Sequence, residues 1–200
     1  MALDELTQTR LIVLAVVLAI VAYWLLGRAK DRRRQARFAV LARSLGGEVE
    51  REGEFLSRFP VEIAGRRFDV RLQHIGRGSG RGGGGWYVVT RVALQGVSEL
   101  HSVDIRPRFR RLLGGEPRGF EEDFTLIDAG YPLRAGWLTD RVRGAIASFY
   151  ALELTPDPLV IEEGRLIHRA HLPVQRFDGP LLRELLTRQA AVAAALEQAL

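Results

Sequence analysis

The first hydrophobic run of the chain extends from Leu11 to Leu26 and contains no charged residue. With Gly27 it amounts to about 17 residues, close to the shortest α-helix that crosses roughly 30 Å of hydrocarbon. Tyr23 and Trp24 lie near its C-terminal end, where amphipathic aromatic side chains favour the membrane interface. The pattern therefore predicts a membrane-spanning helix over residues 11–27.

A cleaved signal peptide and a buried helix of a soluble protein are the two alternatives. Signal peptides carry their positive charge before the apolar region and end it with small residues. Here the run follows Asp4, Glu5 and Arg10 and ends in Tyr-Trp-Leu-Leu. A helix that is apolar on all sides is also found in protein cores, but the basic residues that follow this one fit a core poorly. We therefore adopt the uncleaved anchor.

The positive charges that follow the run predict its orientation, because basic residues beside a membrane span stay on the cytoplasmic side. Residues 1–10 are then a short extracytoplasmic tail, and the chain after Gly27 is cytoplasmic at a bacterial inner membrane. Residues 28–46 are predicted as a basic juxtamembrane helix that ends at Gly46 and Gly47. The side chains expected to contact anionic lipid head groups are Arg28, Lys30, Arg32, Arg33, Arg34 and Arg37.

Residues 47–200 are predicted to form one cytoplasmic domain that is rich in strands in its first part. Hydrophobic residues alternate with polar ones over 68–73, and one face of 86–94 is apolar, as in half-buried strands. Strands are predicted, in chain order, at 60–63, 68–73, 86–94, 100–105, 124–127, 159–161 and 165–172. The last two form a hairpin with its turn at 162–164.

Two helices are predicted in the second part of this domain. Thr139 is a candidate N-cap for the first, whose apolar stripe ends near Leu152. The second begins near Asp178 and carries an apolar face to Leu200. This face is expected to pack on the domain's own sheet, with a partner helix as the alternative. The fold class is therefore α+β, an N-terminal transmembrane helix followed by an antiparallel sheet packed by two or three helices.

The order of these elements resembles that of bacterial single-pass membrane proteins of unknown function. The resemblance rests on the anchor, the basic helix that ends in Gly-Gly, and the β-rich middle. Three short segments add to it, Gly119–Phe124, Trp137–Asp140 and Ile161–Leu166, together with the terminal Leu/Ala-rich helix. It implies the architecture and carries no activity or catalytic residue.

The composition of the chain shows where its positive charge is concentrated and which side-chain chemistry it lacks. The chain has 29 basic and 24 acidic residues and a net charge of +5. Residues 28–43 hold seven of the basic residues and one acid, so the rest of the chain is close to neutral. The absence of cysteine excludes disulfides, a thiol nucleophile and a thiolate metal site, and fits a reducing compartment.

Two arginine-containing segments are candidates for contact with an anion or a partner. Gly76–Gly85 is the first, and a flexible hairpin connection is its simplest interpretation, because glycine-rich backbone is costly to order. It lacks the Gly-Lys-Ser/Thr ending and the following helix of a phosphate-binding loop. The second is Arg106–Arg111, a loop that suits an anionic surface or a nucleic acid. The candidate contacts are Arg77, Arg81, Arg106, Arg108, Arg110 and Arg111.

The sequence predicts no catalytic, cofactor-binding or metal-ligating residue. His168 and His171 are an odd number of positions apart on a predicted strand, which sends them to opposite faces of the sheet. The carboxylates of Glu121, Glu122 and Asp123 are interpreted as the solvent face of a strand. A binding role is therefore favoured over an enzymatic one.

The leading hypothesis is a membrane-anchored, non-catalytic cytoplasmic interaction or scaffold domain. Its expected partners are anionic lipid head groups and an unidentified protein, with a homo-oligomer as a further option. The alternative is a membrane-tethered nucleic-acid or anion-binding domain that uses the arginine-rich loops. An enzyme whose site is assembled from scattered residues is a third reading, and no cofactor is expected.

Overall fold

The computed structural model describes residues 2–53, 56–75, 85–108, 118–128, 130–131, 133–152, 157–170 and 177–200. The chain forms two compact units, Met1–Arg37 and Phe38–Leu200. Helix α1 (Ala2–Ser44) runs through the boundary between them. By length and composition, its segment Ile12–Ser44 contains a stretch long and apolar enough to cross a membrane, with a mean hydropathy of 2.3.

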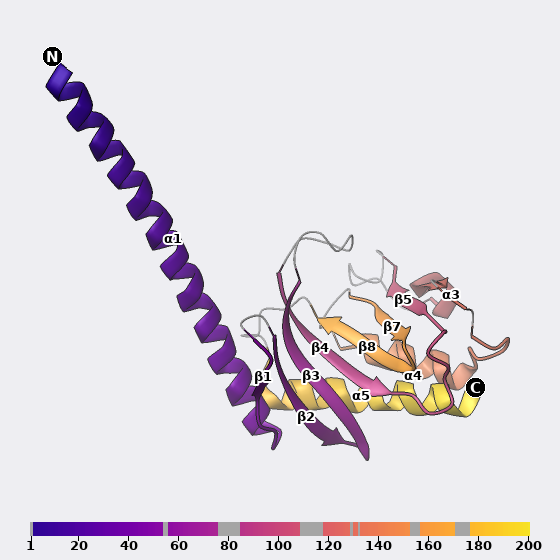
Figure 1. Ribbon diagram of the computed structural model, residues 1–200. Coiled ribbons are helices and arrows are strands. Elements are labelled where there is room, and N and C mark those ends of the chain that lie inside the picture. The colour runs from indigo at the N-terminus through magenta and orange to yellow at the C-terminus, as the bar shows by residue number, and fades with distance from the viewer. Residues whose placement is uncertain are drawn as a thin grey trace. The chain divides into compact units, whose positions relative to one another are not determined.

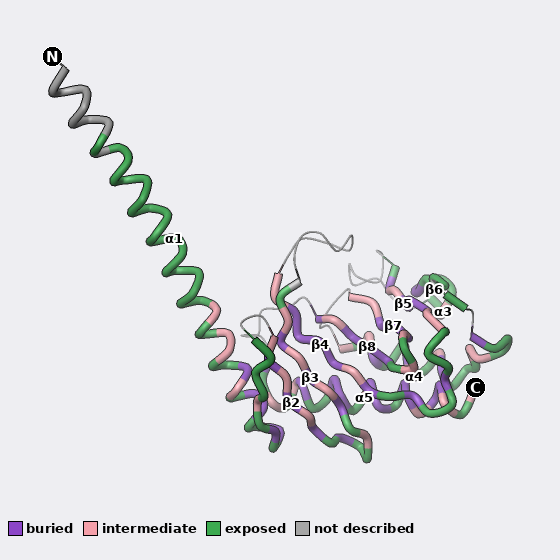
Figure 2. Tube along the Cα trace, viewed as in Figure 1, coloured by how far each residue is buried: buried purple, intermediate pink, exposed green. Residues whose placement is uncertain are grey.

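The larger unit is built on an antiparallel sheet that has eight strands in the described part of the chain. They are β1 (Glu50–Arg51), β2 (Leu56–Ile63), β3 (Arg66–Ile75), β4 (Gly85–Ala93), β5 (Val103–Pro107), β6 (Phe124–Asp128), β7 (Leu159–Glu162) and β8 (Arg165–Ala170). Their order across the sheet is β1-β2-β3-β4-β8-β7-β5-β6 (Figure 1; β6 is labelled in Figure 2). The hairpin β7–β8 is thus inserted beside β4, so the strands that meet at the centre are far apart in the sequence.

Helices α4 (Asp140–Tyr150) and α5 (Gly179–Ala199) cover one face of this sheet, while α3 (Phe120–Asp123) is a single turn before β6. Helix α4 begins at the predicted cap, because the side chain of Thr139 accepts a hydrogen bond from Val142 N. Helix α5 begins close to the predicted start, where the side chain of Asp178 accepts a hydrogen bond from Leu181 N. The predicted α+β class is confirmed.

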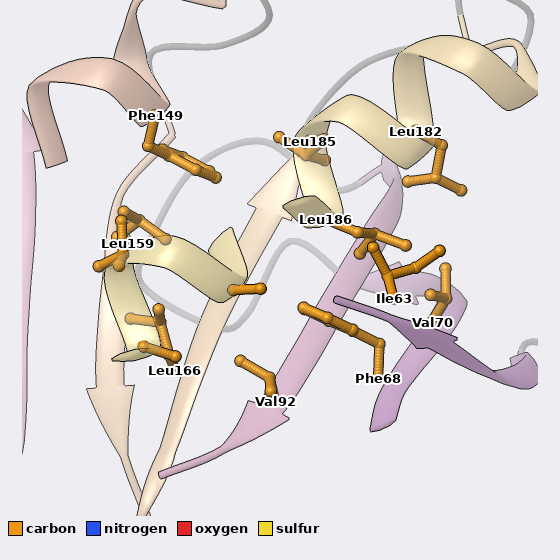
Figure 3. Close-up of a cluster of buried hydrophobic side chains, with 14 of the residues drawn as sticks. Ile63, Phe68, Val70, Val92, Phe149, Leu159, Leu166, Leu182, Leu185 and Leu186 are labelled. Carbon is orange, nitrogen blue, oxygen red and sulfur yellow. The ribbon is translucent and has the colours of Figure 1, made fainter. Parts of the chain in front are cut away.

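The main hydrophobic core lies between α5 and the sheet. Leu182, Leu185 and Leu186 of α5 lie in one cluster with Phe68 and Val92 of the strands (Figure 3). Along β2 and β3, buried residues alternate with more exposed ones (Figure 2), because successive side chains of a strand point to opposite faces. The apolar face of the last predicted helix therefore packs on the domain's own sheet.

Polar contacts within the fold join this core to its edges. Thr90 Oγ1 donates to Gln189 Oε1 at 2.6 Å, and Gln189 Nε2 donates to Leu166 O at 2.9 Å, so α5 is bonded to both central strands. The Tyr150 hydroxyl donates to Ile105 O at 2.8 Å and accepts from Leu159 N at 2.7 Å.

An ion pair and a histidine complete this framework. Arg66 Nη1 donates to Glu197 Oε1 at 2.8 Å, and Gln95 N donates to the same oxygen at 2.8 Å. His168 is fully buried against the ring of Phe149, and burial lowers its pKa to about 3. These contacts therefore link α5 and α4 to the strands of the sheet.

Three local predictions need correction. The strand predicted at 100–105 lies at Val103–Pro107, because the chain is still in a turn at Leu100. Glu121–Asp123 is not the solvent face of a strand, since these residues form α3, and Asp123 is buried at its end. The strand predicted at 60–63 begins earlier, at Leu56, and contains Pro60. A proline is tolerated at this position because β1 pairs only with Ser57 and Arg58 of β2. Pro60 therefore has no neighbouring strand on that side, where its missing N–H would otherwise break a hydrogen bond.

Candidate anion-binding site on the open face of the sheet

The face of the sheet opposite α5 carries a concentration of arginines. Phe68, Val70 and Leu72 of β3 point into the core, so the alternate residues of this strand, Arg67, Asp69 and Arg71, point to the open face. The same alternation brings arginines of β2, β4 and β8 to this face. Their mutual positions follow from the strand register.

Arg91 of β4 lies at the centre of this arrangement. It faces Asp69 across β3 and Ile167 across β8. The four positions diagonal to it on the neighbouring strands are all arginine: Arg67, Arg71, Arg165 and Arg169. Diagonal neighbours are about 7–8 Å apart and within reach of long side chains, so five guanidinium groups share one patch.

A hollow of about 420 Å³ opens at this patch. Pro60 and Ala93 line it with short side chains, which leaves room between the longer ones. Its charged lining consists of Glu50, Arg58, Arg67, Asp69, Arg71, Arg91 and Arg165. Arginines thus outnumber carboxylates by five to two in this lining, and the size is that of a small-molecule pocket.

Two of these arginines already have carboxylate partners. Arg58 Nε lies 2.9 Å from Glu50 Oε2 and 2.8 Å from Glu52 Oε1. Arg71 donates to Asp69 Oδ2 at 2.6 Å. Their charges are therefore balanced within the fold.

The other three lining arginines, Arg67, Arg91 and Arg165, make no hydrogen bond or ion pair with any described residue. Arg91 is the most constrained, because its Nε is buried and lacks an acceptor in the described part of the chain. Burial lowers the pKa of Arg91, the charges of Arg71, Arg165 and Arg169 lower it further, and Asp69 opposes them. Arginine keeps its charge in folded proteins, so the hollow contains positive charge that the described part of the fold does not neutralise.

Guanidinium groups in such a setting bind oxyanions. Each offers several N–H donors in a planar fork, which matches two oxygens of a phosphate or a carboxylate. An anion bound among these three arginines would offset the repulsion between Arg91 and Arg165. The arrangement therefore suits binding, and its permanently charged groups are poor acid–base catalysts.

The loop arginines predicted from the sequence are not the residues that form this hollow. Arg106 pairs with the buried carboxylate of Asp104 at 2.6 Å, and Arg108 Nε donates to Phe124 O at 3.2 Å. Both are thus engaged within the fold. The other four candidates, Arg77, Arg81, Arg110 and Arg111, lie outside the described residues, as does most of Gly76–Gly85.

The predicted lipid contacts all belong to the smaller unit. Arg28, Lys30, Arg32, Arg33 and Arg37 are exposed there, and Arg34 is half-buried beside Asp31 at 2.8 Å. The guanidinium carbon of Arg28 lies 4.1 Å from the centre of the Trp24 ring, a cation–π contact.

The described residues give no new candidate for a metal site. Among the described residues there is no cluster of three or more His, Asp or Glu side chains that could hold a metal. His168 lies in the core, and His171 lies outside the described residues.

Sequence reasoning missed the hollow, although a signal was present. The alternation of Arg67, Asp69 and Arg71 with core residues places three charges on one face of a strand. What the sequence lacked was the pairing of β4 with β8, which brings Arg91 next to Arg165. Comparisons with protein-family models, curated proteins and solved structures gave no match to this chain.

Proposed function

We propose that this protein is a membrane-anchored, non-catalytic binding domain whose open sheet face takes up a phosphate-bearing anion. The observation that carries the proposal is Arg91, a half-buried arginine with a buried Nε that has no acceptor among the described residues. Arginines occupy all four diagonal positions, and the charges of three of them, Arg71, Arg165 and Arg169, oppose its own, while Asp69 attracts it. Such an arrangement is unfavourable in the free protein and becomes favourable when an anion fills the hollow.

The membrane location is part of this proposal. An apolar helix followed by seven basic residues within 28–43 favours a single span with the N-terminus outside and the binding domain in the cytoplasm of a bacterium. The proposal retains the interaction or scaffold role expected from the sequence and adds that the domain recognises an anionic group on its ligand or partner. A protein partner, a homo-oligomer and a nucleic acid remain predictions from the sequence.

Phosphate binding by the full-length protein tests the proposal. The chain is placed in nanodiscs of zwitterionic phosphatidylcholine and titrated with inorganic phosphate by calorimetry at low salt. We expect saturable binding that weakens at least about tenfold in Arg91→Met, the loss expected for a charge-assisted contact. Arg141→Met is the matched control, because Arg141 is exposed on α4 and makes no ion pair with a described residue.

Two results contradict the proposal. One is the absence of phosphate binding by the unaltered chain. The other is equal loss in the Arg91 and Arg141 variants, which would indicate non-specific attraction to a basic protein. Binding through the proposed contacts also weakens as salt is raised, because ions screen exposed charges.

Cysteine labelling tests the orientation separately, and the lack of native cysteine leaves no background. Ala2→Cys and Gln198→Cys are introduced one at a time, Gln198 being exposed on α5. We expect an impermeant maleimide to label position 2 in intact cells and position 198 only after permeabilisation. Labelling of position 198 in intact cells would reverse the orientation.

A further inference from the structure

The hollow has two chemically different ends. Arg67 and Arg165 lie towards one end, next to Ala93, and neither has a partner among the described residues. Glu50 lies towards the other end with Arg58, which it neutralises together with Glu52. Arg91 and Asp69 face each other between the two ends. One side of the hollow therefore attracts negative charge, and the other presents carboxylate oxygens.

Asp69 has acceptor capacity left over. Its Oδ2 accepts from Arg71, while its Oδ1 has no donor in the described part of the chain. A carboxylate has room for about four hydrogen bonds. A bare anion beside Arg91 would be repelled by the charge of this carboxylate, whereas a hydroxyl group on the ligand could donate to it.

These two features together indicate the class of ligand. We infer that the hollow binds a phosphorylated polyol, with its phosphate among Arg67, Arg91 and Arg165 and a hydroxyl donating to Asp69. This inference rests on the proposed function and adds the second half of the ligand. The volume of about 420 Å³ has room for both groups. A soluble sugar or glycerol phosphate and the head group of a polyol phospholipid share this chemistry.

Two probes of similar charge separate the hydroxyl contribution from that of the phosphate. Full-length protein in phosphatidylcholine nanodiscs is titrated with methyl phosphate and with glycerol 3-phosphate, both phosphate monoesters, of which the second carries hydroxyls. We expect glycerol 3-phosphate to bind about tenfold more tightly, the effect of one hydrogen bond to a charged group.

Asp69→Ala is the decisive variant, because its two expected effects have opposite signs. It removes the acceptor, so the preference for glycerol 3-phosphate over methyl phosphate falls to about one. It also removes a negative charge and frees Arg71, so methyl phosphate binds several-fold more tightly. Asp128→Ala is the matched control, since Asp128 is an exposed strand residue of β6 that does not line the hollow.

The outcomes separate this inference from the proposed function. If neither probe binds the unaltered chain, the proposed function fails. If both bind equally and Asp69→Ala leaves their ratio unchanged, anion binding stands and the polyol inference is overturned.

A last arm distinguishes the two sources of the ligand. The glycerol 3-phosphate titration is repeated in nanodiscs that contain phosphatidylglycerol. Because any anionic bilayer repels the probe, nanodiscs with the same fraction of phosphatidylserine are the charge-matched control. An apparent dissociation constant that rises more with phosphatidylglycerol than with phosphatidylserine indicates that the lipid head group competes for the hollow, and an equal one indicates a soluble ligand. Either result, obtained with the expected Asp69→Ala pattern, supports the shared chemistry.

Discussion

Replacement of Arg91 by methionine should make the protein more stable while it weakens anion binding. Methionine keeps an unbranched apolar stem of similar length, so the packing beside Ile167 is largely retained. What disappears is the buried Nε without an acceptor and the charge that faces the neighbouring arginines. Most single substitutions destabilise a protein, which makes this sign distinctive.

The size of the effect follows from the geometry around Arg91. Each exposed like-charged pair costs about 0.2–1 kcal/mol, and the attraction to Asp69 offsets one or two of them. The unsatisfied Nε adds about 1 kcal/mol, at the low end for such groups because the side chain is half exposed. The net gain is about 1 kcal/mol, or a rise of about 2–4 °C in Tm for a chain of this size.

Thermal unfolding of the full-length protein in neutral nanodiscs measures this change. Arg71→Met is the informative comparison, because Arg71 is paired with Asp69 and its loss should leave the stability equal or lower. The gain in Arg91→Met should shrink at high salt, since the repulsion is screened. A loss of more than about 1 kcal/mol in Arg91→Met would refute the reasoning and assign Arg91 a structural role.

Three further predictions concern the framework that holds this face. Tyr150→Phe should lower the free energy of unfolding by about 1–3 kcal/mol, since it strips the backbone of β5 and β7 of buried hydrogen bonds; the exposed Tyr131→Phe should change little in chemical denaturation. Glu197→Gln should lower the free energy of unfolding by about 1–2 kcal/mol in the same assay, because its ion pair with Arg66 is largely buried. Glu184→Gln should cost under about 0.5 kcal/mol, because its ion pair with Arg188 is exposed. Burial lowers the pKa of His168 to about 3 from an ordinary 6.5, so the unfolded chain binds the extra proton and stability falls as the pH drops below about 6.5; His168→Gln should flatten a slope of up to about 1.4 kcal/mol per pH unit between about pH 6 and pH 5.

Local patterns predicted the elements of this fold well. The alternation over Phe68, Val70 and Leu72, the cap at Thr139 and the stripe of α5 each depend on residues close in the sequence. The single turn α3 was missed because four residues show no helical period, and the aromatic residues that flank it favour a strand.

The candidate site was harder to predict, because it depends on strand pairing. The arginine-rich loops were visible as local clusters, yet Arg106 and Arg108 are used within the fold. The hollow instead combines arginines from β2, β3, β4 and β8, and each looks like an ordinary solvent-exposed strand residue in its own segment. Only the insertion of the β7–β8 hairpin beside β4 places Arg165 near Arg91.

The most direct test of the central claim observes the guanidinium of Arg91 itself. Nitrogen-15 NMR of the full-length protein in phosphatidylcholine nanodiscs follows the arginine Nε–H signals, and the signal absent in Arg91→Met identifies this residue. The account predicts that this signal moves saturably with inorganic phosphate while that of Arg141 stays in place. An Arg91 signal that remains unchanged while calorimetry reports saturation would place the anion elsewhere and contradict the account.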